Sequence, residues 1–247
     1  MALIEELEEQ GNFLFKYRSY FPLLFLVITG AVFYFEVLSE NQYLFCESYW
    51  YISLAIGLLG LFVRILTVGF TPANTSGRNT TEGQVAAELN ETGIYSLVRH
   101  PLYVGNFLMW LAVAMLTGNI WFIVSFTFLY WVYYERIMFA EEAFLRNKFG
   151  NKYLQWAKNK PAFIPKIKLP TKPKYPFSLK KVLKKEKNGV AALFGLFWLF
   201  DVIKTGLTDG VWHLPKNQWF WAFVVSSVVY LILKIIKRST DILEDGR

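Results

Sequence analysis

Two short clusters hold most of the side chains in this sequence that could bind and orient a small charged molecule. The first lies in the segment Y-S-L-V-R-H-P-L-Y-V-G and comprises Arg99, His100, Pro101, Tyr103 and Gly105. A proline in the first turn of a helix loses no hydrogen bond, so we expect a helix to begin here with its first N–H groups free. Such a helix end attracts anions, and the guanidinium of Arg99 can bind a carboxylate or phosphate through two parallel hydrogen bonds.

The second cluster is Arg136 followed by the carboxylate pair Glu141 and Glu142. Neighbouring residues on a helix point about 100° apart, so we expect that the two carboxylates do not face one ligand: one binds it and the other supports. Arg136 precedes Glu141 by five residues, so Arg136 and the carboxylate pair can flank one groove. Each cluster also has an ordinary explanation, because arginine and tyrosine anchor helices at membrane surfaces and exposed charge pairs contribute only about 0.3–0.5 kcal/mol.

A predicted helical hairpin brings the clusters together. Residues 102–117 and 120–134 are apolar runs, separated by the turn-favouring pair Gly118-Asn119. At 1.5 Å per residue each run is roughly 24 Å long, enough to carry the chain into a membrane and back. Both clusters should therefore lie on one side, where Gly105 allows close approach of a ligand or a neighbouring helix.

The composition places the chain in a membrane. Of 247 residues, 54% are hydrophobic, 19% aromatic and 18% charged, which is unusual for a soluble domain. In a chain this apolar, the net charge of +7 indicates contact with anionic lipid or a topology signal and not a nucleic-acid partner. The single cysteine, Cys46, excludes an internal disulfide, and no spacing of Cys and His predicts a metal site.

The apolar segments predict an all-α, polytopic bundle of about six spans, preceded by a short solvated helix. The expected spans are residues 20–38, 49–70, 102–117, 120–134, 190–207 and 219–236.

The distribution of positive charge predicts the orientation. Residues 135–189 carry fifteen Lys and Arg, whereas residues 39–48 carry none and residues 208–218 carry only Lys216. The positive-inside rule therefore places both termini and both clusters in the cytoplasm.

Between the spans, the polar loop at residues 71–91 could cover the site. Its sequons at Asn74, Asn79 and Asn90 are interpreted as chance, because glycosylation needs the opposite side of the membrane. Residues 161–176 alternate proline with lysine, which predicts an extended segment. It separates a core at residues 1–170, carrying the cofactor pocket, from a two-span extension at residues 171–247.

Four charged residues within or near the spans are Glu36, Arg64, Asp201 and Lys204, and such residues are costly in hydrocarbon. Asp201 and Lys204 are three apart, so we expect them to pair on one helix face.

The order of motifs resembles a known family. V-R-H-P-L-Y-V-G, an apolar hairpin, E-R-x4-E-E, F-G-x2-Y-x2-W and P-x-F-I-P follow one another over about 30% of the chain. This pattern is similar to the integral-membrane methyltransferases related to isoprenylcysteine carboxyl methyltransferase and the phospholipid methyltransferases. The first two spans and the last two carry no motif of that family.

The resemblance implies S-adenosylmethionine bound at the cytoplasmic membrane boundary. Glu141 or Glu142 would bind its ammonium group, and His100 with the N–H groups around Pro101 its carboxylate. Tyr103 and the P-x-F-I-P segment would line the pocket around the adenine.

The resemblance also implies that Arg99 and Arg136 orient the acceptor. That acceptor would be the carboxylate or phosphate of an amphiphilic lipid or prenylated substrate. Three alternatives remain open: a phospholipid amine N-methyltransferase, an NADPH-dependent enzyme like the sterol reductases, which share an R-H-P-x-Y segment, and a non-enzymatic scaffold.

Overall fold

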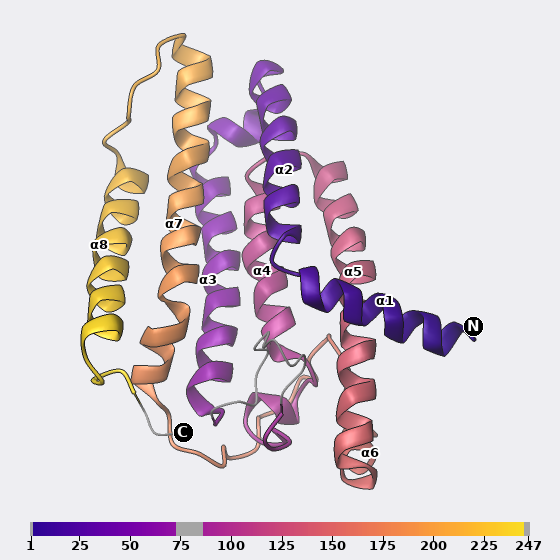
Figure 1. The fold of residues 1–247 in the computed structure, drawn as a ribbon. Coiled ribbons are helices and arrows are strands. Elements are labelled where there is room, and N and C mark those ends of the chain that lie inside the picture. Colours follow the sequence, from indigo (N-terminus) through magenta and orange to yellow (C-terminus); the bar gives the residue numbers. More distant parts are fainter. Residues whose placement is uncertain (1, 73–85, 245–247) are drawn as a thin grey trace.

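The computed structural model describes residues 2–72 and 86–244. Within these residues the regular secondary structure is helical, apart from one isolated bridge between Gly93 and Thr171 (Figure 1). Its helices are α1 (Leu3–Tyr17), α2 (Phe21–Leu38), α3 (Glu47–Phe70), α4 (Pro101–Met115), α5 (Ile120–Phe149), α6 (Asn151–Ala157), α7 (Leu179–Asp209) and α8 (Gln218–Ser239), with 3-10 turns at Gln42–Phe45 and Ile94–Ser96. The all-α prediction is confirmed.

The chain is a polytopic membrane helix bundle. By length and apolar composition, α2, α3, α7 and α8 can each cross a bilayer, while α4 is apolar but has only 15 residues. All six predicted spans coincide with helices, and crossing by α4 and α5 stays a prediction. Figure 1 shows α2, α3, α4, α5, α7 and α8 running alongside one another, with α3 between α4 and α7.

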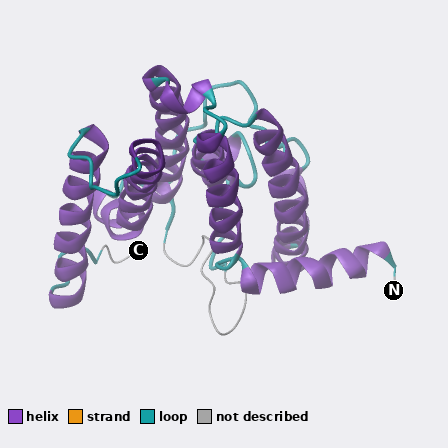
Figure 2. Cartoon of the chain, turned by 90° about the horizontal axis from the view of Figure 1, so that it is seen from above, coloured by secondary structure: helices purple, strands orange, loops and turns teal. Residues whose placement is uncertain are grey.

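One end of the bundle collects the segments that carry the polar clusters. The chain before α4, the end of α5 with α6, the connection from α6 to α7 and the end of α8 all lie there in Figure 1. Viewed from above, α1 extends sideways from the bundle (Figure 2). The prediction that the hairpin returns both clusters to one end is therefore confirmed.

The turn of the hairpin is fixed by hydrogen bonds to α2. Gly118 has a φ of +66°, which a residue with a side chain rarely adopts. Asn119 caps α5 by accepting from the N–H of Phe122 at 2.8 Å, and its amide donates to Glu36 at 2.6 Å. Glu36 also accepts from Asn41 at 2.5 Å. The carboxylate expected to be costly in the membrane is thus paired with two amides.

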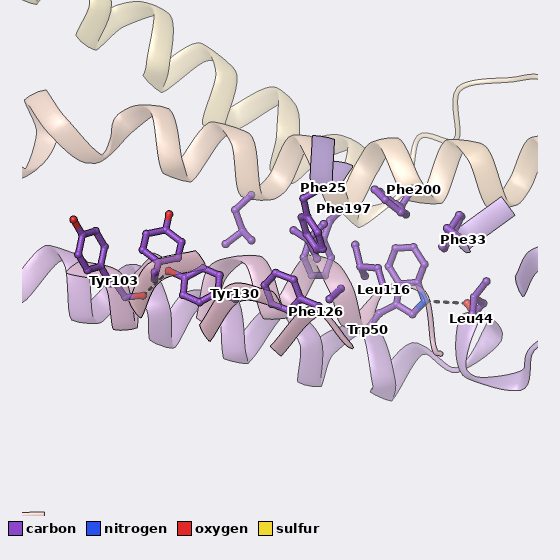
Figure 3. Close-up of a cluster of buried hydrophobic side chains, with 14 of the residues drawn as sticks. Phe25, Phe33, Leu44, Trp50, Tyr103, Leu116, Phe126, Tyr130, Phe197 and Phe200 are labelled. Atoms are coloured by element: carbon purple, nitrogen blue, oxygen red, sulfur yellow. Dashed lines mark hydrogen bonds between the residues drawn. The ribbon is translucent and has the colours of Figure 1, made fainter. Parts of the chain in front are cut away.

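Aromatic side chains fill the core between the helices (Figure 3). The indole of Trp50 donates to the carbonyl of Leu44 at 2.9 Å, and the hydroxyl of Tyr130 donates to the carbonyl of Tyr103 at 2.8 Å. These bonds satisfy the polar ends of buried rings, which is the condition for using Trp and Tyr in a core.

The C-terminal helices share this core. Phe197 and Phe200 of α7 belong to the same buried cluster as Trp50. Lower on α7, Glu186 is 2% exposed and holds Arg64 of α3 through two contacts of 2.8 and 2.9 Å. The predicted division at residue 170 stays a prediction, but α7 packs as an integral part of the bundle.

Other expectations meet mixed outcomes. Asp201 and Lys204 pair at 3.2 Å, and residues 161–176 contain no helix, as predicted. The prediction that the first helix is solvated is wrong for one of its faces. Gly11 and Phe15 are buried there, and a β-carbon added at Gly11 would clash with the carbonyl oxygen of Arg136 on α5. Most of the loop expected to cover the site, including the sequons at positions 74 and 79, lies outside the described residues.

Candidate functional site

The start of α4 is held in place by the proline-rich segment. The N–H groups of Arg99 and His100 donate to the carbonyls of Pro161 and Ala162 at 2.9 and 3.1 Å, and the N–H of Tyr103 donates to the carbonyl of His100. Pro at the first helical position is confirmed. The N–H groups of Arg99 and His100 are therefore not free for an anion, because residues 62 positions later in the chain accept from them, and anion binding at this helix start stays a prediction.

His100 lies between the two carboxylates of α5. Its Nε2 is 2.9 Å from Glu142 Oε1, and its Nδ1 is 3.4 Å from Glu141 Oε2. Arg99 Nη1 contacts the second oxygen of Glu142 at 3.0 Å. Both glutamates contact His100 because the imidazole ring presents a nitrogen to each of them, and the expectation that only one of them binds a ligand stays a prediction.

The electrostatics of this cluster fix its protonation. Burial alone would lower the pKa of His100, but hydrogen bonds to Glu141 and Glu142 and their negative charges raise it to about 9. Burial acts to raise the pKa of each glutamate, yet the opposing effect of His100 leaves both below their ordinary value. At neutral pH the cluster is therefore an imidazolium between two carboxylates, with Arg99 beside one of them.

An aromatic wall adjoins the cluster on the membrane side. The ring of Tyr103 stacks on His100 with centroids 5.6 Å apart, and Tyr134 packs on Tyr103 at 4.9 Å. Tyr103 is thus placed at the cluster as predicted. Phe163, the aromatic residue of P-x-F-I-P, packs instead on Phe107 and Trp131 at 5.7 and 5.6 Å and helps line an apolar groove of about 370 Å³.

Two predicted residues do not join the cluster. Arg136 contacts Gln10 at 3.3 Å and its neighbour Glu135 at 3.1 Å, on the side of α5 that faces α1. Gly105 meets α3: a β-carbon there would be 2.5 Å from Arg64 Cγ and 2.8 Å from the carbonyl oxygen of Gly60. Of the two roles expected for Gly105, the structure shows close approach of a neighbouring helix.

Arg18 is a residue that the sequence did not single out. It follows α1, and its guanidinium lies 3.8 Å from the ring centre of Phe15. Its positive charge contributes to the lowered pKa of Glu141, so it lies near the carboxylate pair. No motif surrounds Arg18, and its position in the junction between two helices was the only available signal.

Buried donors without partners lie on the other side of Glu142. The indole N–H of Trp156 and Nε of Arg99 have no hydrogen-bond partner among the described residues. Tyr153 and Trp156 are 2% and 7% exposed. Burial and the charge of Glu142 raise the pKa of Tyr153, so its hydroxyl is close to that carboxylate. Unsatisfied buried donors are rare and point to a missing acceptor.

A polar cavity of about 290 Å³ lies next to these donors. Leu89 and Tyr95 line it and pack in one cluster with Tyr153 and Trp156, and burial together with the charge of Glu141 raises the pKa of Tyr95. Its rim carries two ion pairs, Lys174 with Glu88 at 2.7 Å and Lys152 with Glu91 at 2.9 Å.

Comparison with known families agrees with this geometry. The phospholipid methyltransferase family matches residues 42–152, which contain α3, the R-H-P segment, the hairpin and both glutamates. The match covers slightly under half of the chain, and over this part the chain is similar to the phospholipid methyltransferases. The family match ends before α7 and α8.

Individual relatives fall into two groups. The chain is 41% identical over 75 residues to protein-S-isoprenylcysteine O-methyltransferase of Schizosaccharomyces pombe, covering 30% of this chain and 32% of the relative. It is 31% identical over 130 residues to a probable protein-S-isoprenylcysteine O-methyltransferase of Oryza sativa, covering 49% and 65%. It is also 32% identical over 118 residues to the nickel-cobalt-cadmium resistance protein NccN of Alcaligenes xylosoxydans xylosoxydans, covering 47% and 51%.

The chain therefore spans between a third and two thirds of the length of these relatives. No solved structure matches it.

Proposed function

We propose that this chain is an integral-membrane methyltransferase that moves a methyl group from S-adenosylmethionine to an ionised oxygen of an amphiphilic acceptor. The match to the phospholipid methyltransferase family and the names of the isoprenylcysteine relatives support methyl transfer to oxygen. The observation that carries the choice of acceptor is the state of His100, whose pKa of about 9 keeps the imidazole protonated at neutral pH.

The residues of the site fit the cofactor. When bound, S-adenosylmethionine supplies an electrophilic methyl group on a sulfonium, flanked by an ammonium, a carboxylate and an adenosine. The carboxylates of Glu141 and Glu142 suit the ammonium, and the unpartnered donors of Arg99 and Trp156 suit the carboxylate. The cavity beside Tyr95 suits the adenosine.

The same residues favour an acceptor that arrives ionised. An amine or alcohol must lose a proton during methylation and needs a base with a pKa near the working pH. His100 is already protonated, while Glu141 and Glu142 have lowered pKa values and are weak bases. A carboxylate or phosphate needs no base. Positioning of the nucleophile then supplies much of the rate.

Cations near the cluster can orient such an anion. Arg99 has an unbonded Nε, and Arg18 adds a second positive charge from the side of α1. A role for Arg136 stays a prediction with less support, because its guanidinium contacts Gln10 and Glu135. The apolar groove lined by Tyr130 and Phe163 can receive the tail of a lipid or prenylated acceptor.

Orientation completes the proposal. The fifteen Lys and Arg of residues 135–189 favour the cytoplasm for the end of the bundle that holds the cluster and the last turn of α8.

Ligand binding to the purified protein tests this proposal. S-adenosylhomocysteine at 100 times its dissociation constant should stabilise the folded protein by about 2.7 kcal/mol, seen as a rise in Tm, whereas NADPH should give no shift. Stabilisation by NADPH alone would favour a sterol-reductase-like enzyme, and no response to either ligand would favour a scaffold.

A further inference from the structure

The ends of α7 and α8 form a cationic surface that the methyltransferase site does not use. Figure 1 shows the first turns of α7 beside the last turns of α8, and the two helices pack on one another. Lys181 is buried and donates to the carbonyl of Thr71, so the other cations in these turns form the surface: Lys180, Lys184, Lys185 and Lys187 on α7 and Lys234, Lys237 and Arg238 on α8. We call these seven residues the α7–α8 basic cluster.

Few carboxylates balance the cluster. Within the described residues 179–187 and 234–244, the carboxylates are Glu186, Asp241 and Glu244. Glu186 is buried and held by Arg64 in the interior of the bundle, so its charge is already matched there. Glu244 pairs with Lys184. The surface therefore keeps a large excess of positive charge, concentrated within a few turns of helix.

Lys187 shows that these cations converge. It is only 8% exposed, and its Nζ donates to the carbonyl of Lys184 at 2.6 Å. It lies close enough to Lys184, Lys234 and Lys237 for their positive charges to act on it. A simple topology signal needs only the number of cations on one side of the membrane. Convergence of three of them on a nearly buried ammonium adds a cost that an anionic ligand would remove.

The surface next to the cluster identifies the class of ligand. Above the cations, α8 presents an exposed apolar face that includes Val228, Leu231, Ile232 and Ile235, each at least half exposed. At the start of α7, Leu179 is 60% exposed. A band of cations below an apolar face on the same helix matches a molecule with an anionic head and hydrocarbon chains. A free anion would gain nothing from the apolar face.

We propose that the α7–α8 basic cluster is a binding site for the headgroup of an anionic phospholipid, whose acyl chains lie along the exposed face of α8. This site lies outside residues 42–152, which match the family, and is independent of methyl transfer.

Native mass spectrometry of the full chain with defined lipids tests the site. The wild-type protein should retain phosphatidylglycerol in preference to phosphatidylcholine. A triple variant, Lys234→Gln with Lys237→Gln and Arg238→Gln, removes cations that make no described ion pair and lie partly or fully exposed, so it should fold. At about fivefold in affinity per cation, it should bind phosphatidylglycerol on the order of a hundredfold more weakly.

A matched control removes the same charge elsewhere. Lys166, Lys168 and Lys172 are exposed in the proline-rich segment, and their replacement by Gln should leave phosphatidylglycerol binding unchanged. The single variant Lys237→Gln should weaken binding about fivefold and serves if the triple variant fails to fold. Equal retention of both lipids, equal loss in the control, or displacement of the lipid by inorganic phosphate alone would each overturn the proposal.

Discussion

His100 carries a positive charge because Glu141 and Glu142 contact its two ring nitrogens. Its pKa rises from an ordinary 6.5 to about 9 in the folded protein, so the folded state holds the proton more tightly than the unfolded state. The resulting stabilisation is complete below about pH 6.5 and is lost as the pH rises through about 9. At about 1.36 kcal/mol per pKa unit, it is on the order of 3 kcal/mol.

We therefore expect the Tm of the wild-type protein to fall between pH 6.5 and 9 in thermal unfolding experiments in detergent. His100→Gln should be less stable at pH 6.5 and should show a much flatter dependence over this window. Parallel curves for the two proteins would mean that His100 does not hold the extra proton.

Glu142 contacts both Arg99 and His100 and lies beside the hydroxyl of Tyr153. Glu142→Gln removes the charge that we expect to bind the cofactor ammonium. Its affinity for S-adenosylhomocysteine should fall by about 1.5–3 kcal/mol, the range for hydrogen bonds to charged groups. Isothermal titration calorimetry gives this number directly. Glu135→Gln, on the same helix but half exposed beside Arg136, is the control and should bind as the wild type does.

The sequence predicted the core of this site because its motif residues lie at the two ends of one hairpin. The sequence alone therefore predicts that Arg99, His100 and Glu142 lie together. Arg18 could not be predicted in this way, because it reaches the site through the packing of α1, which no local pattern describes. The predicted position of Arg136 failed for the same reason: the side of α5 that carries it is covered by α1.

At the scale of elements, α4 is positioned by its contact with α3. Gly60 and Gly105 face one another, and the methylene groups of Arg64 cover Gly105. Gly105→Ala should force these helices apart and shift the R-H-P segment, at a cost of about 1–3 kcal/mol. Gly30 has no atom within 4 Å of an added β-carbon, so Gly30→Ala is the matched control. Equal Tm values for the two variants would show that α3 and α4 are not in close contact at Gly105.

Helices were easier to predict than the contacts between them. Each long apolar run became a helix because its backbone must bond internally in a membrane. The docking of residues 161–162 onto the start of α4 joins parts of the chain 62 residues apart and depends on backbone donors, which side-chain patterns do not reveal.

At the scale of the whole molecule, the bundle gathers both clusters, the proline-rich segment and the end of α8 at one end. Single cysteines at Lys172 and Lys216, each in a Cys46→Ser background, test the predicted orientation, since both positions are exposed and lie at opposite ends. Lys172→Cys should react only with thiol reagents on the cytoplasmic side, and Lys216→Cys only with reagents on the other side. Labelling of both from one side would rule out this arrangement.

The product of methyl transfer tests the central claim most directly. The purified protein, reconstituted in bilayers, is supplied with S-adenosylmethionine labelled in its methyl group, together with membrane lipids and isoprenylated cysteine. The label should appear in an amphiphile as a base-labile methyl ester or a methyl phosphate, and Glu142→Gln should transfer far less. Label on an amine nitrogen, or no transfer above the level of Glu142→Gln, would contradict the account.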